Sequence, residues 1–466
     1  MMNKFRVILG LASKGNTPVW SPTSGGSRLV LAATGGGKTT CVAIPTILSL
    51  IEDRTRAMMI IDAKNGEIAS QIGPTIIKSG RRFAVLDDTR ELGPDYPYRI
   101  RVNPFGNVIA AYESGSPNLV FEIENVAHTL IDEPNDDPKN FYFRQVPRQI
   151  IECALLALLR HSKSLATPGG LSAFLADTRS WRGFIDRAAE GDDPVLRQRA
   201  GQIRELRDKD PEHYSQHMLA ALSALGSFQI GSPLHEAGRN AELTHEEVIR
   251  DHWVVCIVQN QNVAARLGTY FGLHILSFMA AQMNGAAGAA DYILDEFCNA
   301  PLREALNRVT VMRGYGGRFH FIGQSFADVE RRYGLKEAAM LAENCTTKQY
   351  LKFSSFEESE RVSKAMGEVI SITDSLSMSS NPVSLGMSLG YQMGRERTFT
   401  AEELMRLSED EQILHIAGIG WIHCRKIRQN QIAPYCFELA GNPLEGGKLT
   451  PDPKIDLSPR QGRKAS

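Results

Sequence analysis

The sequence has almost no net charge. Lys and Arg together number 52 and Asp and Glu 53, so the formal charge at pH 7 is -1. Proteins that hold nucleic acid or anionic lipid by bulk attraction carry a large basic excess. The balance excludes that mode of binding, and any contact with nucleic acid must come from a local group of side chains.

Cysteine is scarce, and its spacing shows no pattern. The chain has seven cysteines, an odd number, and none of them forms a C-x-x-C pair. Disulfide frameworks and structural zinc sites usually need such pairing. We therefore expect free and mostly buried thiols, as in a reducing cytosol.

Long hydrophobic runs are also missing. A helix that crosses a bilayer needs about 20 apolar residues, whereas the N-terminal apolar stretch covers only residues 7–12. The most apolar helical run, 267–283, contains His274 and Gln282 and is interpreted as a core helix. We expect the chain itself to have no transmembrane segment and to be soluble and cytoplasmic.

Short apolar runs, separated by polar turns, are typical of strands buried on both faces of a parallel sheet. With 42% hydrophobic and 23% charged residues among 466, the chain has the composition of a folded protein with two or three domains. The fold class expected is α/β with a mainly parallel sheet. The predicted strands are 28–32, 57–61, 83–86, 253–258, 292–294, 319–323 and 349–353.

A glycine-rich loop lies between the first of these strands and a helical pattern over 38–51, in which Pro45 should cause a kink. The loop reads Ala-Ala-Thr-Gly-Gly-Gly-Lys-Thr over 32–39, which is a P-loop with Ala32 at the usual first glycine. Glycines let backbone N–H groups converge on phosphate, and the helix N-terminus adds a favourable dipole. The alternative is a glycine-rich turn that caps an ordinary helix. The residues expected to bind nucleotide are Thr34, Gly35, Gly36, Gly37, Lys38, Thr39 and Thr40.

Two adjacent acids, Asp295 and Glu296, end a later apolar strand. In ATPases of the RecA-like class, the first acid orients Mg²⁺ and the second polarises the attacking water as general base. We therefore expect Thr39 and Asp295 to hold Mg²⁺, Lys38 to bridge the terminal phosphates of ATP, and Glu296 to act as base. A solvated strand end is the alternative for the acid pair.

Two further residues are candidates for catalysis. Gln324 follows the strand expected beside the P-loop strand, where an amide can touch the γ-phosphate or the water. Arg313 could serve as an arginine finger in the site of a neighbouring subunit. The alternatives are a helix-capping amide for Gln324 and a surface ion pair for Arg313.

These motifs together resemble the type IV secretion coupling proteins, the TraG/TraD kind of conjugative ATPase. The resemblance covers about residues 25 to 430 and is most specific at Leu294-Asp295-Glu296-Phe297, followed by Arg313 and Gln324-Ser325. Asp62-Ala63-Lys64-Asn65-Gly66-Glu67 is similar to the Asp-Pro-Lys-Gly-Glu of the family, although Ala63 and Asn65 differ. Other similar stretches are Asn103-Pro104, Tyr315-Gly316, Asn344-Cys345, 357–367 and 418–422.

The resemblance implies a RecA-like nucleotide-binding domain over 28–134 and 236–440, interrupted by an all-α domain over 135–235. It also implies a homo-hexamer at the cytoplasmic face of the bacterial inner membrane. The expected partners are single-stranded DNA, a relaxase or effector proteins, and components of the inner-membrane secretion channel. Members of the family commonly carry transmembrane helices ahead of the P-loop, and the segment 1–27 has none.

Three further segments carry weaker expectations. Residues 370–395, rich in Ser, Met, Gly and Asn, should form a surface excursion without regular periodicity. The tail 441–466 is expected to be disordered. Two sets of basic residues are interpreted mainly as solvated: Arg197, Arg199, Arg204 and Arg207 in the all-α segment, and Lys454, Arg460, Arg463 and Lys464 in the tail.

Two other functions remain open from the sequence. A DNA pump of the FtsK or HerA kind would share the same site, although the helical segment favours the coupling family. A nucleotide-gated adaptor would use the helical segment to bind proteins and would hydrolyse ATP slowly or not at all.

Overall fold

A large twisted sheet forms the centre of the molecule in the computed structural model, which describes residues 6–22, 25–133, 141–284, 288–300, 303–381 and 384–458. The sheet has 11 strands in the order β2-β1-β13-β12-β9-β3-β8-β7-β4-β6-β5. The strands from β9 to β5 in this order are all parallel, as expected. The bounds of the sheet strands are β1 Ile8–Leu11, β2 Pro18–Trp20, β3 Ser27–Ala32, β4 Arg56–Asp62, β5 Phe83–Leu86, β6 Val254–Val258, β7 Ala289–Asp295, β8 Gly317–Gly323, β9 Cys345–Lys352, β12 Glu411–Ile416 and β13 Gly420–Arg425.

All seven predicted strands are therefore confirmed, and the antiparallel strands β1, β2, β12 and β13 extend the sheet beyond them at the β9 edge. The sequence signals for these four are weak because they are short or include charged and polar residues. The parallel strands are almost wholly buried; in β4 every residue is buried. Alternate residues of β4 point to opposite faces of the sheet. Met59 packs in the hydrophobic core on one face, and Met58 and Ile60 pack in the core on the other.

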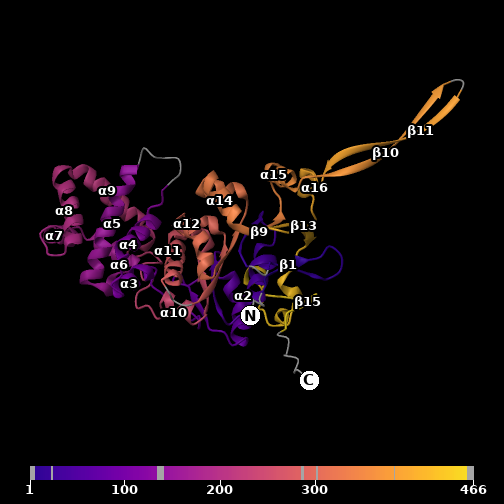
Figure 1. The fold of residues 1–466 in the computed structure, drawn as a ribbon. Helices are drawn as coiled ribbons and strands as arrows, with labels where there is room; N and C mark the ends of the chain where they lie inside the picture. The colour runs from indigo at the N-terminus through magenta and orange to yellow at the C-terminus, as the bar shows by residue number, and fades with distance from the viewer. Residues whose placement is uncertain are drawn as a thin grey trace.

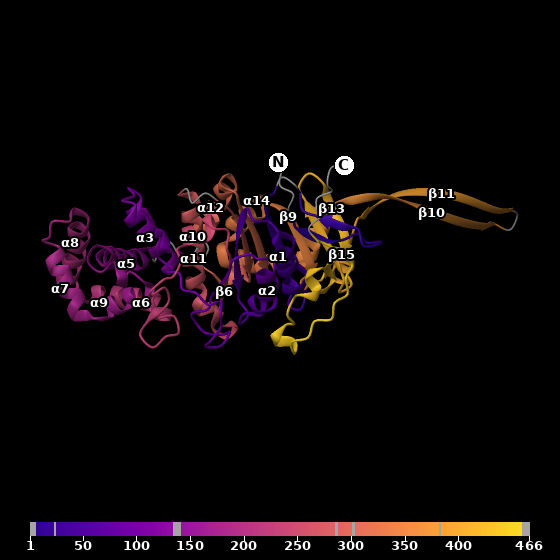
Figure 2. The same cartoon turned by 90° about the horizontal axis from the view of Figure 1, so that it is seen from below.

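Helices cover both faces of the sheet (Figure 2). The π-helical turn Lys38–Ala43 and α1 (Ile44–Leu50) pack on one face with α2 (Glu67–Lys78). Pro45 lies in the first turn of α1, directly after the π-helical turn, so its missing N–H falls where the helix changes its hydrogen-bonding pattern. The opposite face packs against α11 (Ala264–Met283) and α12 (Arg303–Met312). His274 and Gln282 are buried, which confirms that the run 267–283 is a core helix.

Between β5 and β6 the described chain is mostly helical, and Figure 1 shows this part extending to one side of the sheet. Helices begin at Gly106, ahead of residue 135, and α4 contacts both α5 and α11. Because α3 and α4 precede residue 135, the domain boundaries proposed at 135 and 235 stay a prediction. The helices of this part are α3 Gly106–Glu113, α4 Leu119–Leu130, α5 Phe141–His161, α6 Pro168–Ala176, α7 Thr178–Ala188, α8 Pro194–Lys209, α9 Pro211–Ala224 and α10 His245–Arg250.

After β8 come α13 (Phe326–Tyr333), α14 (Leu335–Asn344), α15 (Phe356–Met366) and α16 (Ala401–Met405). A long arm separates the last two helices. It consists of β10 (Glu368–Asn381) and β11 (Ser384–Arg397), paired in register from Glu368↔Arg397 to Asn381↔Ser384, and it projects away from the body (Figure 1). Residues 370–395 do form a surface excursion, but a regular one, whose strands the sequence did not reveal because Gly and Asn are depleted in strands.

The prediction of a disordered tail over 441–466 is wrong for the described residues 441–458. We call residues 440–458 the C-terminal strap. It contains β15 (Ile455–Asp456), which pairs with β14 (Ile432–Ala433), and Leu449, Ile455 and Leu457 pack against the core. These apolar contacts stabilise a segment whose composition alone suggested disorder. Residues 459–466, with Arg460, Arg463 and Lys464, lie outside the described residues.

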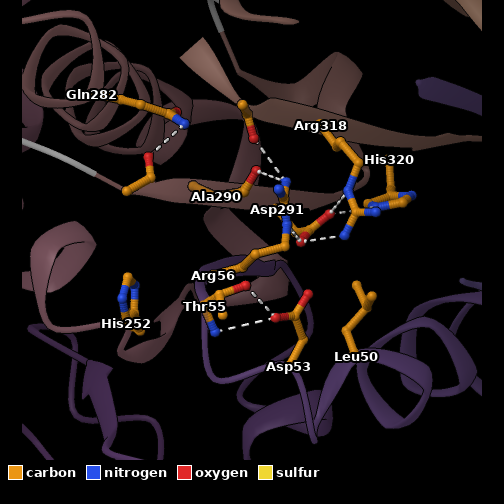
Figure 3. Close-up of polar contacts among 12 residues, drawn as sticks. Leu50, Asp53, Thr55, Arg56, His252, Gln282, Ala290, Asp291, Arg318 and His320 are labelled. Carbon is orange, nitrogen blue, oxygen red and sulfur yellow. Dashed lines mark hydrogen bonds and ion pairs between the residues drawn. The ribbon is translucent and has the colours of Figure 1, made fainter. Parts of the chain in front are cut away.

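A buried ionic cluster joins three strands near their amino ends. Asp291 of β7 lies between Arg56 of β4, at 2.7 Å, and Arg318 of β8, also at 2.7 Å (Figure 3). Arg56 also donates to the carbonyls of Ala290 and Gly316, at 2.9 and 2.8 Å. Burial alone would raise the pKa of Asp291, but the two guanidinium groups hold it well below its ordinary value. The cluster fixes the register of the strands that end in the candidate site.

All seven cysteines are free, and all except the partly exposed Cys298 are buried, which confirms the prediction of unpaired thiols. Among the residues that the structure describes, no helix combines the length and the apolar character needed to cross a bilayer.

Candidate nucleotide site

The P-loop leaves the carboxyl end of β3 and begins the helix at Lys38. Gly35 and Gly37 have φ values of 73° and 89°, in the left-handed region where a side chain is strained. The Gly36 N–H donates to the carbonyl of Ala33 at 2.9 Å, which closes the loop. The glycine run therefore forms a tight turn ahead of a helix N-terminus, as the P-loop interpretation requires.

Glu296 meets Lys38 in the structure. Oε1 of Glu296 lies 2.5 Å from Nζ of Lys38, and both side chains are largely buried, at 14% and 6% exposure. Glu296 has a φ of 50°, unusual for a residue other than glycine, and its N–H donates to Oδ1 of Asp295 at 3.2 Å. Strained backbone of this kind is concentrated at functional sites. The turn places the two acids at the same edge of the sheet as the P-loop.

Gln324 completes this group from the neighbouring strand. β8 pairs directly with β3, and Gln324 follows its last residue. Its Nε2 donates to Oε2 of Glu296 at 3.3 Å, and its side chain is exposed. The structure thus brings together Lys38, Glu296 and Gln324, which is consistent with their predicted roles.

Arg313 lies apart from them. It precedes β8, at the opposite end of that strand from Gln324, and is exposed. It cannot reach Lys38 of its own chain across a strand of about 20 Å. A role as an arginine finger in a neighbouring subunit stays a prediction.

The remaining predicted residues belong to the loop and its helix. Thr39 and Asp295 are buried, at 5% and 1% exposure, whereas Thr34 is exposed and Thr40 is partly buried. Burial raises the pKa of Asp295 to about 6, with Lys64 opposing that rise. Burial likewise raises the pKa of Asp62 to about 7. The site therefore concentrates carboxyl groups that water does not solvate well.

Three residues of the site were missing from the predicted set. Nζ of Lys64 donates to Oγ1 of Thr39 at 3.3 Å, and the same Thr39 hydroxyl donates to Oε2 of Glu67 at 3.3 Å. Asn442 of the C-terminal strap donates to Oε1 of Glu67 at 2.9 Å. The 62–67 loop directly follows a buried strand, and this position is the feature of the sequence by which Lys64 and Glu67 could have been identified. The sequence carries no comparable signal for Asn442.

The chemistry of these side chains fits Mg²⁺. Four carboxylates, those of Asp62, Glu67, Asp295 and Glu296, face only two ammonium groups, those of Lys38 and Lys64. Among the described residues no group of three or more His, Cys, Asp or Glu side chains could hold a metal by itself. Mg²⁺ suits such a site because it takes one or two protein oxygens and fills its shell with water and substrate phosphate.

Three of the four basic residues singled out in the all-α segment pair with nearby acids. Arg199 bonds Glu152, Arg204 lies 2.9 Å from Glu190, and Arg207 lies 2.7 Å from Asp186. Arg197 donates to the carbonyl of Gly191 at 3.1 Å, and Lys454 of the C-terminal strap lies 3.0 Å from Asp452. These pairings agree with a solvated, ion-paired surface and not with a continuous phosphate track.

Comparison with known proteins gives a consistent result. Residues 290–409 match the family model described as the TraM recognition site of TraD and TraG. This range begins in β7 and includes Asp295, Glu296, Gln324 and the arm. No curated protein matches the chain by sequence.

Solved structures share the fold at low sequence identity. The bacterial conjugative coupling protein TrwBdeltaN70 in its unbound form has a TM-score of 0.66 and 15% identity, over 90% of this chain and 88% of that one. TrwB in complex with ADP and Mg²⁺ has a TM-score of 0.62 and 14% identity, over 86% and 85%. VirB4 of Thermoanaerobacter pseudethanolicus has a TM-score of 0.53 and 15% identity, over 93% and 98%.

The shared architecture confirms the predicted fold class, a RecA-like domain with a mainly parallel sheet and an all-α part. The family match over residues 290–409 and the shared fold support the resemblance to proteins of the TraG/TraD kind that the motifs indicated.

Proposed function

We propose that this chain is an ATP-hydrolysing coupling protein of conjugation or type IV secretion. It would recruit single-stranded DNA bound to a relaxase, or protein effectors, and pass them to the secretion channel at the cytoplasmic face of the inner membrane. The observation that carries this proposal is the meeting of Lys38, Glu296 and Gln324 at one edge of the sheet. Solved structures of TrwB in complex with ADP and Mg²⁺, and with a non-hydrolysable ATP analogue, support it.

Each side chain of the site has a separate role in hydrolysis. Lys38 exchanges the carboxylate of Glu296 for the terminal phosphates of ATP, because both are anionic partners for the same ammonium group. Glu296, released from Lys38, then accepts the proton of the attacking water, while Gln324 orients that water. Thr39 and Asp295 would hold Mg²⁺, which supplies positive charge to the phosphate oxygens.

We propose that part of the nucleoside enters a small cavity beside the P-loop. A cavity of about 110 Å³ is lined by Gly36, Cys41, Phe353, Leu404 and other residues. Lys426 also lines it and donates to the carbonyl of Gly36 at 3.3 Å. Its apolar residues lie beside charged ones, Lys352, Glu409 and Arg428 among them, and the glycines of the P-loop form part of its wall.

The partners follow from the family comparison. Because residues 290–409 match a model described as a TraM recognition site, a TraM-like protein is a candidate partner for this region. A homo-hexamer is also part of the proposal, since Arg313 can complete an active site only from a neighbouring chain.

Measurements of ATP turnover and of mass by light scattering test the proposal. We expect hydrolysis that single-stranded DNA stimulates, and a hexamer that forms with single-stranded DNA and an ATP analogue. Stimulation by duplex DNA alone would instead identify a pump of the FtsK or HerA kind. Nucleotide binding without hydrolysis under all conditions would identify a nucleotide-gated adaptor and contradict the proposal.

A further inference from the structure

The loop after β4 turns a lysine and a glutamate towards the P-loop. Asn65 and Gly66 both have left-handed φ values, 53° and 79°, so the chain reverses between Lys64 and Glu67. The reversal is anchored on the segment after β6, because the Asn65 N–H donates to the carbonyl of Gln259 at 3.0 Å. The loop is therefore held in position, and both side chains lie against Thr39.

Both oxygens of Glu67 are engaged although the side chain is buried. Oε2 accepts from the Thr39 hydroxyl at 3.3 Å and Oε1 accepts from Asn442 at 2.9 Å. Glu67 is the first residue of α2, where the helix dipole favours a negative charge. Its carboxylate is thus fixed in orientation from two sides, by the P-loop helix and by the C-terminal strap.

Lys64 supplies the positive charge at these oxygens. Its Nζ lies 3.3 Å from Thr39 Oγ1 and 3.8 Å from Glu67 Oε2. The Thr39 hydroxyl oxygen therefore accepts a hydrogen bond from Lys64 with the lone pairs that it would offer to a metal ion. A divalent cation and the Lys64 ammonium group need the same oxygen, and they repel each other at such a distance.

We propose that Lys64 is the internal counter-cation of the metal site: it holds Thr39 and Glu67 and must leave them when Mg²⁺ binds. Glu67, oriented by Asn442, then faces the metal as an additional acidic group. The proposal rests on the proposed function, since it assumes that the P-loop site takes a nucleotide with Mg²⁺. Lys64 and Glu67 are positioning residues for the metal.

Metal binding without turnover tests the proposal. Mn²⁺, whose free aquo ion gives an electron paramagnetic resonance signal, is titrated into the full chain in the presence of ADP. Lys64→Met removes the ammonium group but keeps an unbranched side chain. We expect Lys64→Met to bind Mn²⁺ at least about tenfold more tightly than the parent, because a competing positive charge is gone. Glu67→Gln should bind it more weakly than the parent.

Lys78→Met is the matched control. Lys78 lies at the other end of α2 and pairs with Glu438 at 2.7 Å, so it tests for the loss of an ion pair on the same helix. We expect no change in Mn²⁺ affinity. Thermal unfolding in chelator gives a second measurement: Lys64→Met should unfold at a lower temperature than the parent, and Mn²⁺ should raise its midpoint by more than it raises that of the parent.

The outcomes separate three failures. If Lys64→Met binds Mn²⁺ as the parent does or more weakly, the counter-cation role is wrong while the nucleotide site stands. If Glu67→Gln binds it as the parent does, the role of Glu67 is wrong. If neither the parent nor any variant binds Mn²⁺ with ADP, the metal–nucleotide site itself is wrong, and the proposed function fails with it.

Discussion

Nζ of Lys38 lies 2.5 Å from Oε1 of Glu296, although 258 positions separate the two residues in the sequence. The strands that carry them are not neighbours, because β8 lies between β3 and β7. Their contact depends on the parallel order of the three strands, whose carboxyl ends meet at one edge. The sheet therefore brings the candidate catalytic group together from distant segments.

Gln324 should matter for turnover and not for binding. Its amide bonds Glu296 at 3.3 Å and is exposed. Gln324→Ala should lower kcat for ATP by about 10²-fold, the usual effect of losing one polar group at the reacting atoms, and leave ADP affinity unchanged. Steady-state ATPase kinetics and a fluorescent ADP titration measure both. Gln216→Ala, at an exposed position on α9, is the control, and equal kcat values in the two variants would contradict the role.

Asp291 should be important for stability. It is buried between Arg56 and Arg318. Asp291→Asn keeps the shape but leaves two buried guanidinium groups without their carboxylate, which typically costs about 3 kcal/mol or more. Denaturant unfolding at pH 7 measures the loss. Asp251→Asn, which removes a surface partner of Arg82, should cost less than about 1 kcal/mol, and a similarly small loss for Asp291→Asn would contradict the account.

Most of the candidate catalytic group could be predicted from the sequence because its members lie in short local patterns. Lys38 follows a glycine run after a strand, and Asp295 and Glu296 end an apolar strand. Each such pattern indicates both the chemical role of the residue and its position at the end of a strand, and therefore at the edge of the sheet. The seven parallel strands were predicted for the same reason, since burial on both faces leaves a continuous apolar run.

The contacts that the sequence did not reveal depend on distant segments. Asn442 reaches Glu67 across 375 positions, and nothing in a strap rich in Gly, Pro and Lys indicates that partner. The arm is a different case, because its two consecutive strands pair locally, only with each other among the described residues, and 370–395 contains little alternation. The contact of Asn442 arises from tertiary pairing, which composition does not encode, whereas the arm lacks the alternation by which a strand is predicted.

Because His245 and His274 are buried, we expect the free energy of unfolding to fall in mild acid. Burial lowers the pKa of both imidazoles, that of His245 to about 3. Their rings bond each other, Nε2 to Nδ1, at 3.0 Å. The unfolded chain takes up protons at both histidines below a pH of about 6.5, whereas the folded chain does not, so stability falls as the pH drops below that value.

The variant His274→Phe tests this pH dependence. It removes one proton-binding group from the unfolded state and should reduce the slope of unfolding free energy against pH, between pH 6 and 5, by up to about 1.4 kcal/mol per unit. Denaturant unfolding at several pH values gives the slope. A slope equal to that of the parent would show that the folded chain takes up the same proton.

The arm should be dispensable for the fold and for nucleotide binding. Val369 and Glu396 pair directly at its base, so residues 370–395 can be replaced by an Asn-Gly turn that joins them. Because the arm strands pair only with each other in the described chain, the thermal midpoint and the ADP affinity should be unchanged. A clear fall in either quantity would mean that the arm contacts the body.

Lys38 and Glu296 should act together as one ATPase site. The most direct test of this role measures ATP binding and ATP turnover in the same preparations of Glu296→Gln and Lys38→Ala. We predict that Glu296→Gln binds ATP with Mg²⁺ but turns over at least about 10²-fold more slowly, and that Lys38→Ala loses binding. Turnover at the parental rate in Glu296→Gln, or unchanged binding and turnover in Lys38→Ala, would contradict the account.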